Sequence, residues 1–530
     1  MRIRLLLCCL LFGFSAIGQV SLVDDINPTG DASPLKLTVF KKSLYFTAND
    51  GTNGRELWQY NGTNTTLFDI NTTAGAGSSP TGLFPFQGNL YLSADDGNNG
   101  KELWRGDGTS FSLFLDINSG SGDATPNAFV EYNGQMVFTA FQPLPVAREP
   151  MISDGTVFGT QLLADVSPVT NTSSNAEFYT EYNGNLYFSG ASTVGGANGV
   201  QFYVTDGTGA GTQMVKRINS SGDAFPRDYI VYNNLIYFTA EDGVNGRELW
   251  VSDGTNAGTQ LVQDLYSGPI GSSPGFFTIY NNRLYFKASH ATLGTELFYV
   301  NTSGSIVNAA NINPGSASSL PSCLKVFNGK LYFSATDGTS GTELWETSGT
   351  AVSTVMTKNI NPGSNSSSPK EFTEYNGKLY FNASEDFTGA ELWVTNGTSA
   401  GTIMVADINP SFGPQGDPEQ LTVFNNKLLF VANNGTSGRE LFEYTDPTLS
   451  VQHQELNKDL TIYPNPVSEN FKIDNESQIK SIVIYNIQGK EVKVFGYKQS
   501  VYGIANLKSG LYFAEIVTDR GVVSKKIIKH

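Results

Sequence analysis

A unit of about 48 residues recurs along most of this chain, and it limits the possible folds more than any other feature. Each copy carries Glu-Leu-Trp or a variant of it, and a Leu-Tyr-Phe landmark usually stands 12 residues earlier. The copies begin at Glu56, Glu102, Glu149, Gln201, Glu248, Glu296, Glu343, Glu391 and Glu440, with degraded motifs at 149 and 201. A repeat of this length is typical of solenoids and propellers.

Each unit predicts four short β-strands separated by turn residues. In the unit at 323–366, Asn328-Gly329 is a strong hairpin signal, because both central residues of the tight turn need positive φ. The strands that we expect in this unit are 323–327, 331–335, 343–346 and 354–360. Four strands per unit predict an all-β fold, a β-propeller of about nine four-stranded blades.

The two ends of the repeat region predict that the ring closes. A first copy of the fourth strand, residues 22–27, precedes the first full unit, and the last unit stops near Tyr444 without one. If the N-terminal strand completes the final blade, the chain ends are joined and no sheet edge stays open. An open solenoid of the same units is the alternative.

The repeat resembles the ELWxxDGT repeat family of exported bacterial proteins. The best copy runs from Glu248 through Asp253-Gly254-Thr255, and the resemblance covers about residues 20–446. It implies a propeller-like architecture and export, and it implies no activity, so no catalytic residue follows from it.

Residues 1–18 predict a secretory signal peptide. Arg2 and Arg4 precede an apolar run, and Ala16-Ile17-Gly18 is a small-residue cleavage site, so we expect cleavage after Gly18. No segment is long enough to predict a transmembrane span. The mature chain then keeps one cysteine, Cys323, which we expect in the core. The net charge of −16 argues against nucleic acid as a partner.

Composition changes after residue 446. Residues 447–458 predict a linker, and residues 459–530 predict a small β-sandwich with a net charge of +3, against −21 for residues 19–458. The conspicuous residues of this module include Pro464, Asn465, Pro466, Gly489, Gly510, Gly521, Lys525 and Lys526. In these residues it resembles the type A C-terminal sorting domain of the type IX secretion system. The resemblance implies type IX machinery as a partner and a secreted or outer-membrane surface location in a Gram-negative bacterium.

Three residue types that recur in the repeat, Asp, Glu and Trp, are candidates for metal or ligand binding. The turn aspartates Asp107, Asp154, Asp206 and Asp253 suit calcium, but Ser348 and Asn396 replace them elsewhere, which favours a turn role and predicts no cofactor. The glutamates Glu56, Glu102, Glu248, Glu343 and Glu391 would bond to N–H groups of the preceding turn or line a ligand face. The tryptophans Trp58, Trp104, Trp250, Trp345 and Trp393 would pack between blades or form a sugar-stacking ring.

Together these features favour an exported binding or scaffold protein whose equivalent loops share common faces. A polysaccharide or an envelope protein is the expected partner. An extracellular glycan-active enzyme and a structural surface-layer component are the alternatives, because fold alone does not decide function. The units show no catalytic constellation: the repeat region holds one histidine, His290, which we expect at a surface turn.

Overall fold

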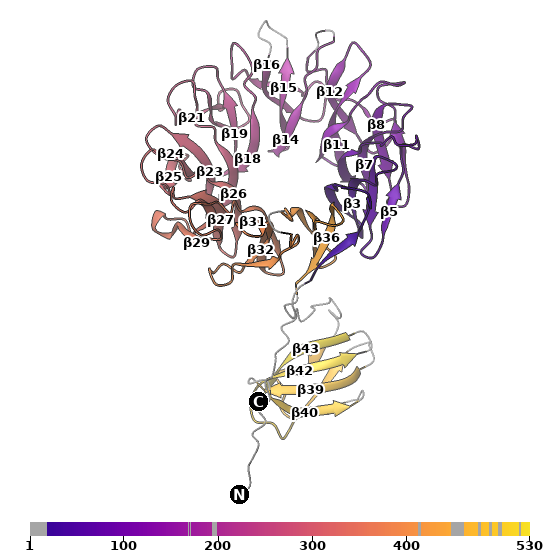
Figure 1. Cartoon of the computed structure of the whole chain (residues 1–530), viewed down its shortest axis with the longest axis vertical. Coiled ribbons are helices and arrows are strands. Elements are labelled where there is room, and N and C mark those ends of the chain that lie inside the picture. Colours follow the sequence, from indigo (N-terminus) through magenta and orange to yellow (C-terminus); the bar gives the residue numbers. More distant parts are fainter. Residues whose placement is uncertain are drawn as a thin grey trace. The chain divides into compact units, whose positions relative to one another are not determined.

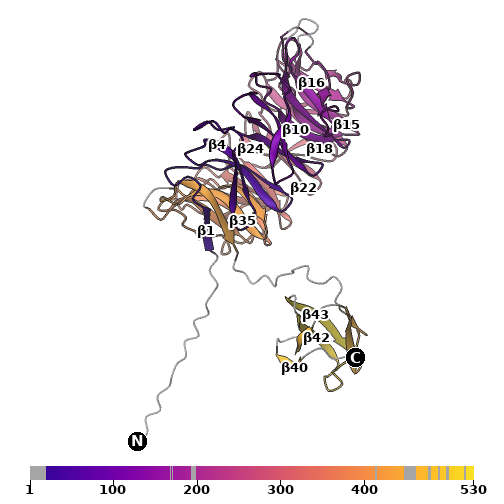
Figure 2. The same ribbon diagram turned by 90° about the vertical axis from the view of Figure 1, so that its right-hand side faces the viewer.

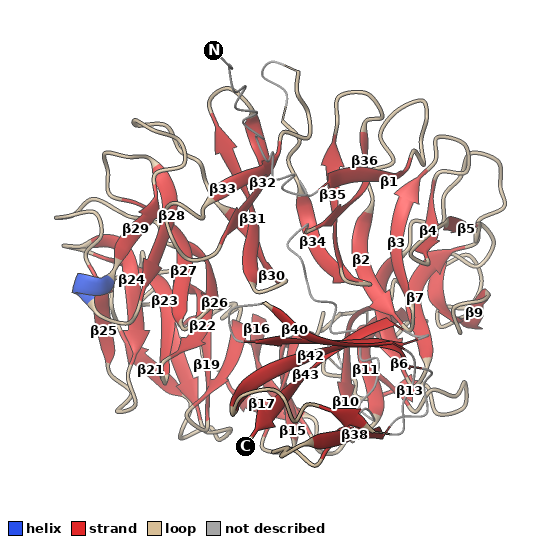
Figure 3. Cartoon of the chain, turned by 90° about the horizontal axis from the view of Figure 1, so that it is seen from below, coloured by secondary structure: helices blue, strands red, loops and turns tan. Residues whose placement is uncertain are grey.

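The computed structural model describes residues 19–446 apart from 168, 170, 193–198 and 412–414, and residues 461–530 apart from 475–478, 487–489, 497–500 and 519–520. The predicted signal peptide, the predicted linker and Gly489 lie outside these residues. The chain divides into two compact units after Asp446. Within the described residues the one helix is a 3-10 turn, η1 (Ala351–Ser353), and strands form the rest of the regular structure (Figure 3). No helix there is long and apolar enough to cross a bilayer.

Within the described residues, the first unit contains nine four-stranded antiparallel sheets, which we number in chain order. Sheets 1 to 4 consist of β2 (Leu35–Phe40), β3 (Ser43–Asn49), β4 (Arg55–Tyr60) and β5 (Thr65–Phe68); β6 (Thr81–Phe86), β7 (Asn89–Asp95), β8 (Lys101–Gly106) and β9 (Phe111–Leu115); β10 (Asn127–Tyr132), β11 (Gln135–Gln142), β12 (Ala147–Ser153) and β13 (Gln161–Leu162); and β14 (Glu177–Tyr182), β15 (Asn185–Ser192), β16 (Gly199–Thr205) and β17 (Gln213–Lys216).

Sheets 5 to 8 follow the same order. They consist of β18 (Arg227–Tyr232), β19 (Leu235–Glu241), β20 (Arg247–Ser252) and β21 (Gln260–Gln263); β22 (Gly275–Tyr280), β23 (Arg283–His290), β24 (Gly294–Val300) and β25 (Ile306–Ala310); β26 (Ser322–Phe327), β27 (Lys330–Thr336), β28 (Thr342–Thr347) and β29 (Val355–Lys358); and β30 (Lys370–Tyr375), β31 (Lys378–Glu385), β32 (Gly389–Thr395) and β33 (Ile403–Ala406). The all-β prediction is therefore confirmed.

Sheet 9 joins the two ends of the unit. It contains β34 (Glu419–Phe424), β35 (Lys427–Asn433) and β36 (Arg439–Thr445), and its fourth strand is β1 (Gln19–Asp24), which pairs antiparallel with β36. The prediction that the N-terminal strand completes the last unit is confirmed. In Figure 1 the indigo start of the unit lies beside its orange end.

The sheets pack on one another in chain order. The first strands of successive sheets contact each other, and β2 of sheet 1 also contacts β34 of sheet 9. Figure 1 shows the sheets in a circular arrangement, and Figure 2 shows them from the side. The core lies between neighbouring sheets: Leu44 and Phe46 of β3 pack against Phe424 and Leu441 of sheet 9, and all four side chains are buried. Burial of these layers is the main favourable contribution to folding.

Local sequence explains the strand boundaries. Asn328 and Gly329 both take positive φ between β26 and β27, as the hairpin signal predicts. The second residue of each first strand forms a bulge with positive φ, and eight of these nine residues are not glycine. Cys323 occupies this position in β26 and is only half-buried, so its predicted place in the core is wrong.

The second unit, described by itself, contains two small sheets. One consists of β37 (Thr461–Tyr463), β38 (Asn470–Asp474) and β41 (Tyr502–Gly503). The other consists of β40 (Glu491–Gly496), β39 (Ile479–Asn486), β42 (Gly510–Thr518) and β43 (Gly521–Lys529). Their shared core includes Phe471 from the first sheet and Ile482 and Ile516 from the second.

Candidate functional site: the repeated side chains and a charged pocket

The repeated glutamates are buried anchors for the loops between sheets. Glu343, at the start of β28, is fully buried. The backbone N–H of Ile360 donates to its Oε2 at 2.7 Å, and that of Ser367 donates to its Oε1 at 3.1 Å. The Ser367 hydroxyl donates to Oε2 at 2.6 Å. The carboxylate thus holds the loop that leads from β29 to the next sheet.

The same arrangement recurs around the unit. Backbone N–H groups of the loop after the fourth strand donate to Glu56, Glu102, Glu149, Glu248, Glu296, Glu391 and Glu440. The expected partners, N–H groups of the preceding turn, are therefore corrected: the donors belong to the following loop. Glu149 in the degraded motif behaves like the others, and Gln201 accepts from Ile218 through Oε1 at 2.8 Å.

Burial sets the electrostatics of these glutamates. Desolvation raises the pKa of Glu102, Glu149, Glu391 and Glu440 to about 7, although the N–H bonds act in the opposite direction. The pKa of Glu343 is also raised by burial, and the Ser367 hydroxyl opposes that shift. Because these side chains are enclosed, they form no ring of carboxylates on a ligand face.

The repeated tryptophans lie between sheets. Trp345 is 8% exposed and packs with Tyr280 of sheet 6, Ile312 of the loop after that sheet, and Leu331 of its own sheet. Trp58, Trp104, Trp250 and Trp393 are equally enclosed. The alternative of an exposed sugar-stacking ring requires open indole faces, and the burial of all five contradicts it.

The turn aspartates are exposed and use their carboxylates within the turn. Oδ1 of Asp253 accepts from the backbone N–H of Thr255 at 2.9 Å and from its hydroxyl at 2.7 Å. Asn396 accepts the same two bonds from Thr398, at 3.0 and 2.8 Å, so the turn does not require a charge. These bonds lower the pKa of Asp253, and equivalent bonds bring that of Asp107 to about 2. Asp154 and Asp206 have the same arrangement. No group of three or more potential ligands (His, Cys, Asp or Glu) occurs within the described ranges.

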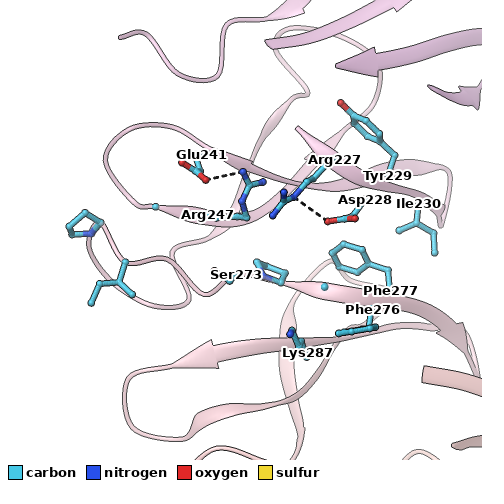
Figure 4. A pocket seen from close by; sticks show the side chains of 15 residues that line it. Arg227, Asp228, Tyr229, Ile230, Glu241, Arg247, Ser273, Phe276, Phe277 and Lys287 are labelled. Carbon is cyan, nitrogen blue, oxygen red and sulfur yellow. Dashed lines mark hydrogen bonds and ion pairs between the residues drawn. The ribbon is translucent and has the colours of Figure 1, made fainter. Parts of the chain in front are cut away.

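A charged pocket lies between sheets 5 and 6. It has a volume of about 790 Å³ and is lined by β18, the β19–β20 hairpin, the loop before β22, and β22 and β23. Figure 4 shows Arg227, Asp228, Glu241 and Arg247 on one side and Phe276 and Lys287 on the other. This volume is in the range of small-molecule sites, roughly 300–1,000 Å³.

The pocket has distinct ion pairs. Arg247 donates to Oε1 of Glu241 at 2.8 Å, and Arg227 Nε lies 3.7 Å from Oδ2 of Asp228. Burial lowers the pKa of Arg247, and the positive charge of Arg227 lowers it further, because like charges disfavour each other. The ammonium of Lys287 lies 5.0 Å from the centre of the Phe276 ring. Three cations thus face two carboxylates.

This pocket was not predicted from the sequence, although the sequence contains a signal for it. The residue after the Leu-Tyr-Phe landmark is uncharged in eight units and is Lys287 in the sixth. The eight counterparts are Thr47, Ser93, Thr139, Ser189, Thr239, Ser334, Asn382 and Val431. Lys287 belongs to one unit alone, so it does not appear among the residues that the units share.

The candidate sorting residues lie close to β43. Asn465 donates through Nδ2 to the carbonyl of Lys526 at 2.7 Å, and its Oδ1 accepts from the N–H of Ile528 at 2.9 Å. Asn465 stands between Pro464 and Pro466, so this segment is tied to the last strand. Gly510 and Gly521 begin β42 and β43, and Lys525 and Lys526 lie within β43.

Comparison with known proteins identifies the second unit. Residues 461–530 match the family of secretion system C-terminal sorting domains, here that of the type IX system. This match shows that the chain carries a tail for export to the cell surface or the medium. No curated protein matches the sequence significantly.

Several solved structures resemble parts of the chain. A puromycin hydrolase is 11% identical with a TM-score of 0.37, over 78% of this chain and 60% of that one. A puromycin-hydrolyzing peptidase of Mycobacterium tuberculosis is 9% identical with a TM-score of 0.37, over the same shares of the two chains. PorZ of Porphyromonas gingivalis, described as an essential surface component of the type IX secretion system, is 11% identical with a TM-score of 0.27, over 93% and 81%. The chain thus spans about 60% of the length of the two hydrolases.

Proposed function

We propose that this exported protein is a binding module of the bacterial surface, built on a closed nine-bladed propeller of ELWxxDGT repeats. The contact between β2 and β34 and the pairing of β1 with β36 support a closed ring. In this proposal the type IX machinery recognises residues 459–530, and the propeller then acts at the surface or in the medium of a Gram-negative cell. A polysaccharide or another envelope component is its partner.

The charged pocket between sheets 5 and 6 carries this proposal. The glutamates and tryptophans that define the repeat are occupied in holding loops and sheets together, as their burial indicates. The pocket combines exposed charge with an aromatic ring, in a cavity large enough for a ligand. A concave site with a few convergent polar groups is the usual form of a binding site.

A glycan array probed with the mature chain, residues 19–530, tests the proposal. We expect selective binding of a subset of glycans, with and without calcium. Calcium dependence would assign Asp107, Asp154, Asp206 and Asp253 a role as metal ligands. An array blank under both conditions, together with no capture of an envelope protein after crosslinking on cells, would contradict a binding function.

A further inference from the structure

We propose that the pocket between sheets 5 and 6 binds an acidic saccharide, a sugar residue with a ring carboxylate within a polysaccharide. This inference rests on the proposed binding function and names the ligand class for one site. Its elements are two cations with unused donors, an exposed aromatic ring, two carboxylates that can accept hydroxyl groups, and a space left by a glycine.

Two cations are available to an anionic group. The side chain of Arg227 is 49% exposed, and its one ion pair among the described residues is the 3.7 Å contact with Asp228. Lys287 forms no ion pair within that part of the chain and instead lies over the Phe276 ring. Arg247 is already engaged, because it bonds Glu241 and the carbonyl of Phe225. A guanidinium and an ammonium with free N–H groups favour a carboxylate ligand.

The Phe276 ring favours a sugar over a simple anion. Phe276 is 44% exposed and lies at the bulge of β22, the position whose positive φ all nine sheets share. An exposed aromatic face beside charged groups can pack against the C–H face of a sugar ring. Nearby, Ile270 is 70% exposed and adds apolar surface to the same pocket.

The two carboxylates distinguish a saccharide from an acidic peptide. Asp228 and Glu241 only accept hydrogen bonds when ionised, and sugar hydroxyls are suitable donors. A peptide rich in Asp or Glu would bring several further carboxylates toward these two residues. A uronate residue brings one carboxylate, which suits the cations Arg227 and Lys287, together with several hydroxyl groups, which suit the acceptors Asp228 and Glu241.

Gly275, which has no side chain, leaves room for a ligand in the pocket. It pairs with Lys287 in the register of β22 and β23, where other sheets place a side chain such as Leu35 or Lys370. A Cβ added at Gly275 would meet only Cε of Lys287 within 4 Å, at 3.9 Å. The fold therefore accepts a side chain here, and Gly275→Leu would fill the pocket without removing a charge.

Isothermal titration of the mature chain with uronate oligosaccharides tests the inference. The probes are oligomers of galacturonate, glucuronate and mannuronate, their methyl esters of equal length, and a polyglutamate peptide. We expect one acidic oligomer to bind at least tenfold more tightly than its ester and than polyglutamate. Both Gly275→Leu and Lys287→Ser should weaken binding at least tenfold, whereas Lys325→Ser, which removes a lysine from β26, should not.

The contrary outcomes are equally distinct. Equal binding of ester and acid, tighter binding of polyglutamate, no binding of any acidic oligomer, or an unchanged affinity in Gly275→Leu would each overturn the inference. Selective binding of neutral glycans on the array together with any of these results would leave the binding function standing. Circular dichroism of each variant, matched to the parent protein, shows that a loss of binding is not a loss of fold.

Discussion

At the scale of single residues, the repeat buries the carboxylate of its recurring glutamate away from solvent. Each glutamate accepts bonds from backbone N–H groups that would otherwise be buried without partners. An unsatisfied buried polar group is costly, so this side chain stabilises the loop that connects one sheet to the next. The repeated glutamate is thus explained by the geometry of the connection.

Replacing one anchor should destabilise the repeat unit strongly. In Glu343→Ala, the N–H groups of Ile360 and Ser367 lose their acceptor, at about 1–3 kcal/mol for each group left unpaired. We expect a clear fall in the urea midpoint, measured by tryptophan fluorescence, because all five tryptophans lie in the repeat region, between residues 58 and 393. The exposed Glu374→Ala is the control and should leave the midpoint unchanged; equal midpoints for both variants would contradict the anchor role.

The buried glutamates also predict how stability depends on pH. The folded-state pKa of Glu102, Glu149, Glu391 and Glu440 is about 7, above the ordinary 4.5, so folding favours their protonated form. Their contribution is complete below about pH 4.5 and is lost as pH rises through 7. We therefore expect the urea midpoint to fall between pH 5 and pH 8.

A variant with glutamine at these four positions is the control for the pH prediction. The chain already places an amide at this site in Gln201, whose Nε2 donates to the carbonyls of Asn219 and Gly222. The variant should show a flatter midpoint between pH 5 and 8. The turn aspartates have lowered pKa values and titrate below this window. A midpoint that rises with pH in the parent protein would show that the sign is wrong.

At the scale of elements, the strands were largely predictable from the sequence, and the charged pocket between sheets 5 and 6 was not. Asn-Gly turns and the Leu-Tyr-Phe landmark have local causes, so the strand expected at 323–327 appears as β26 with one added residue. The partners of Glu343 depend on a loop 17 to 24 residues further along, and sequence placed them wrongly in the preceding turn. The pocket at Lys287 requires two sheets to be packed together, which no spacing within one unit shows.

The pairing of β1 with β36 predicts a specific crosslink. Gln19 and Thr445 are partners in the antiparallel register, so cysteines at both positions should form a disulfide on mild oxidation. The link would join the two ends of the repeat unit, and we expect a higher melting temperature than for the reduced form. Cysteines at Gln19 and Ser348, the counterpart of Thr445 in the seventh copy of the repeat, should not link. Absence of a link in the first pair would favour an open solenoid.

At the scale of the whole molecule, the second unit determines where the first one acts. The sorting-domain family match assigns residues 461–530 to export, while the pocket lies entirely within the first unit. The export tail and the proposed binding pocket are therefore on separate parts of one chain. Removing the tail should change the location of the protein and leave its ligand binding intact.

Deletion of residues 447–530 tests this separation in a bacterium that has a type IX system. We expect the truncated protein to accumulate in the periplasm, whereas the full chain crosses the outer membrane and reaches the surface or the medium. Fractionation and immunoblotting measure this difference. An Asn465→Ala variant loses both bonds to β43 and should reduce export in part. Unchanged surface delivery of the truncated protein would contradict the assignment.

The shared ninth sheet has a consequence for how the chain matures. The first strand, β1, pairs with β36, the last strand of the repeat region. Just after β1, the N–H of Ile26 donates to Glu440, 414 residues later. The first strand to be synthesised therefore has no partner until the last one has been made. Closing so long a loop is entropically unfavourable until every intermediate sheet has formed. Until β36 has been made, β1 has no partner strand, and an unpaired strand edge is open to pairing with other chains.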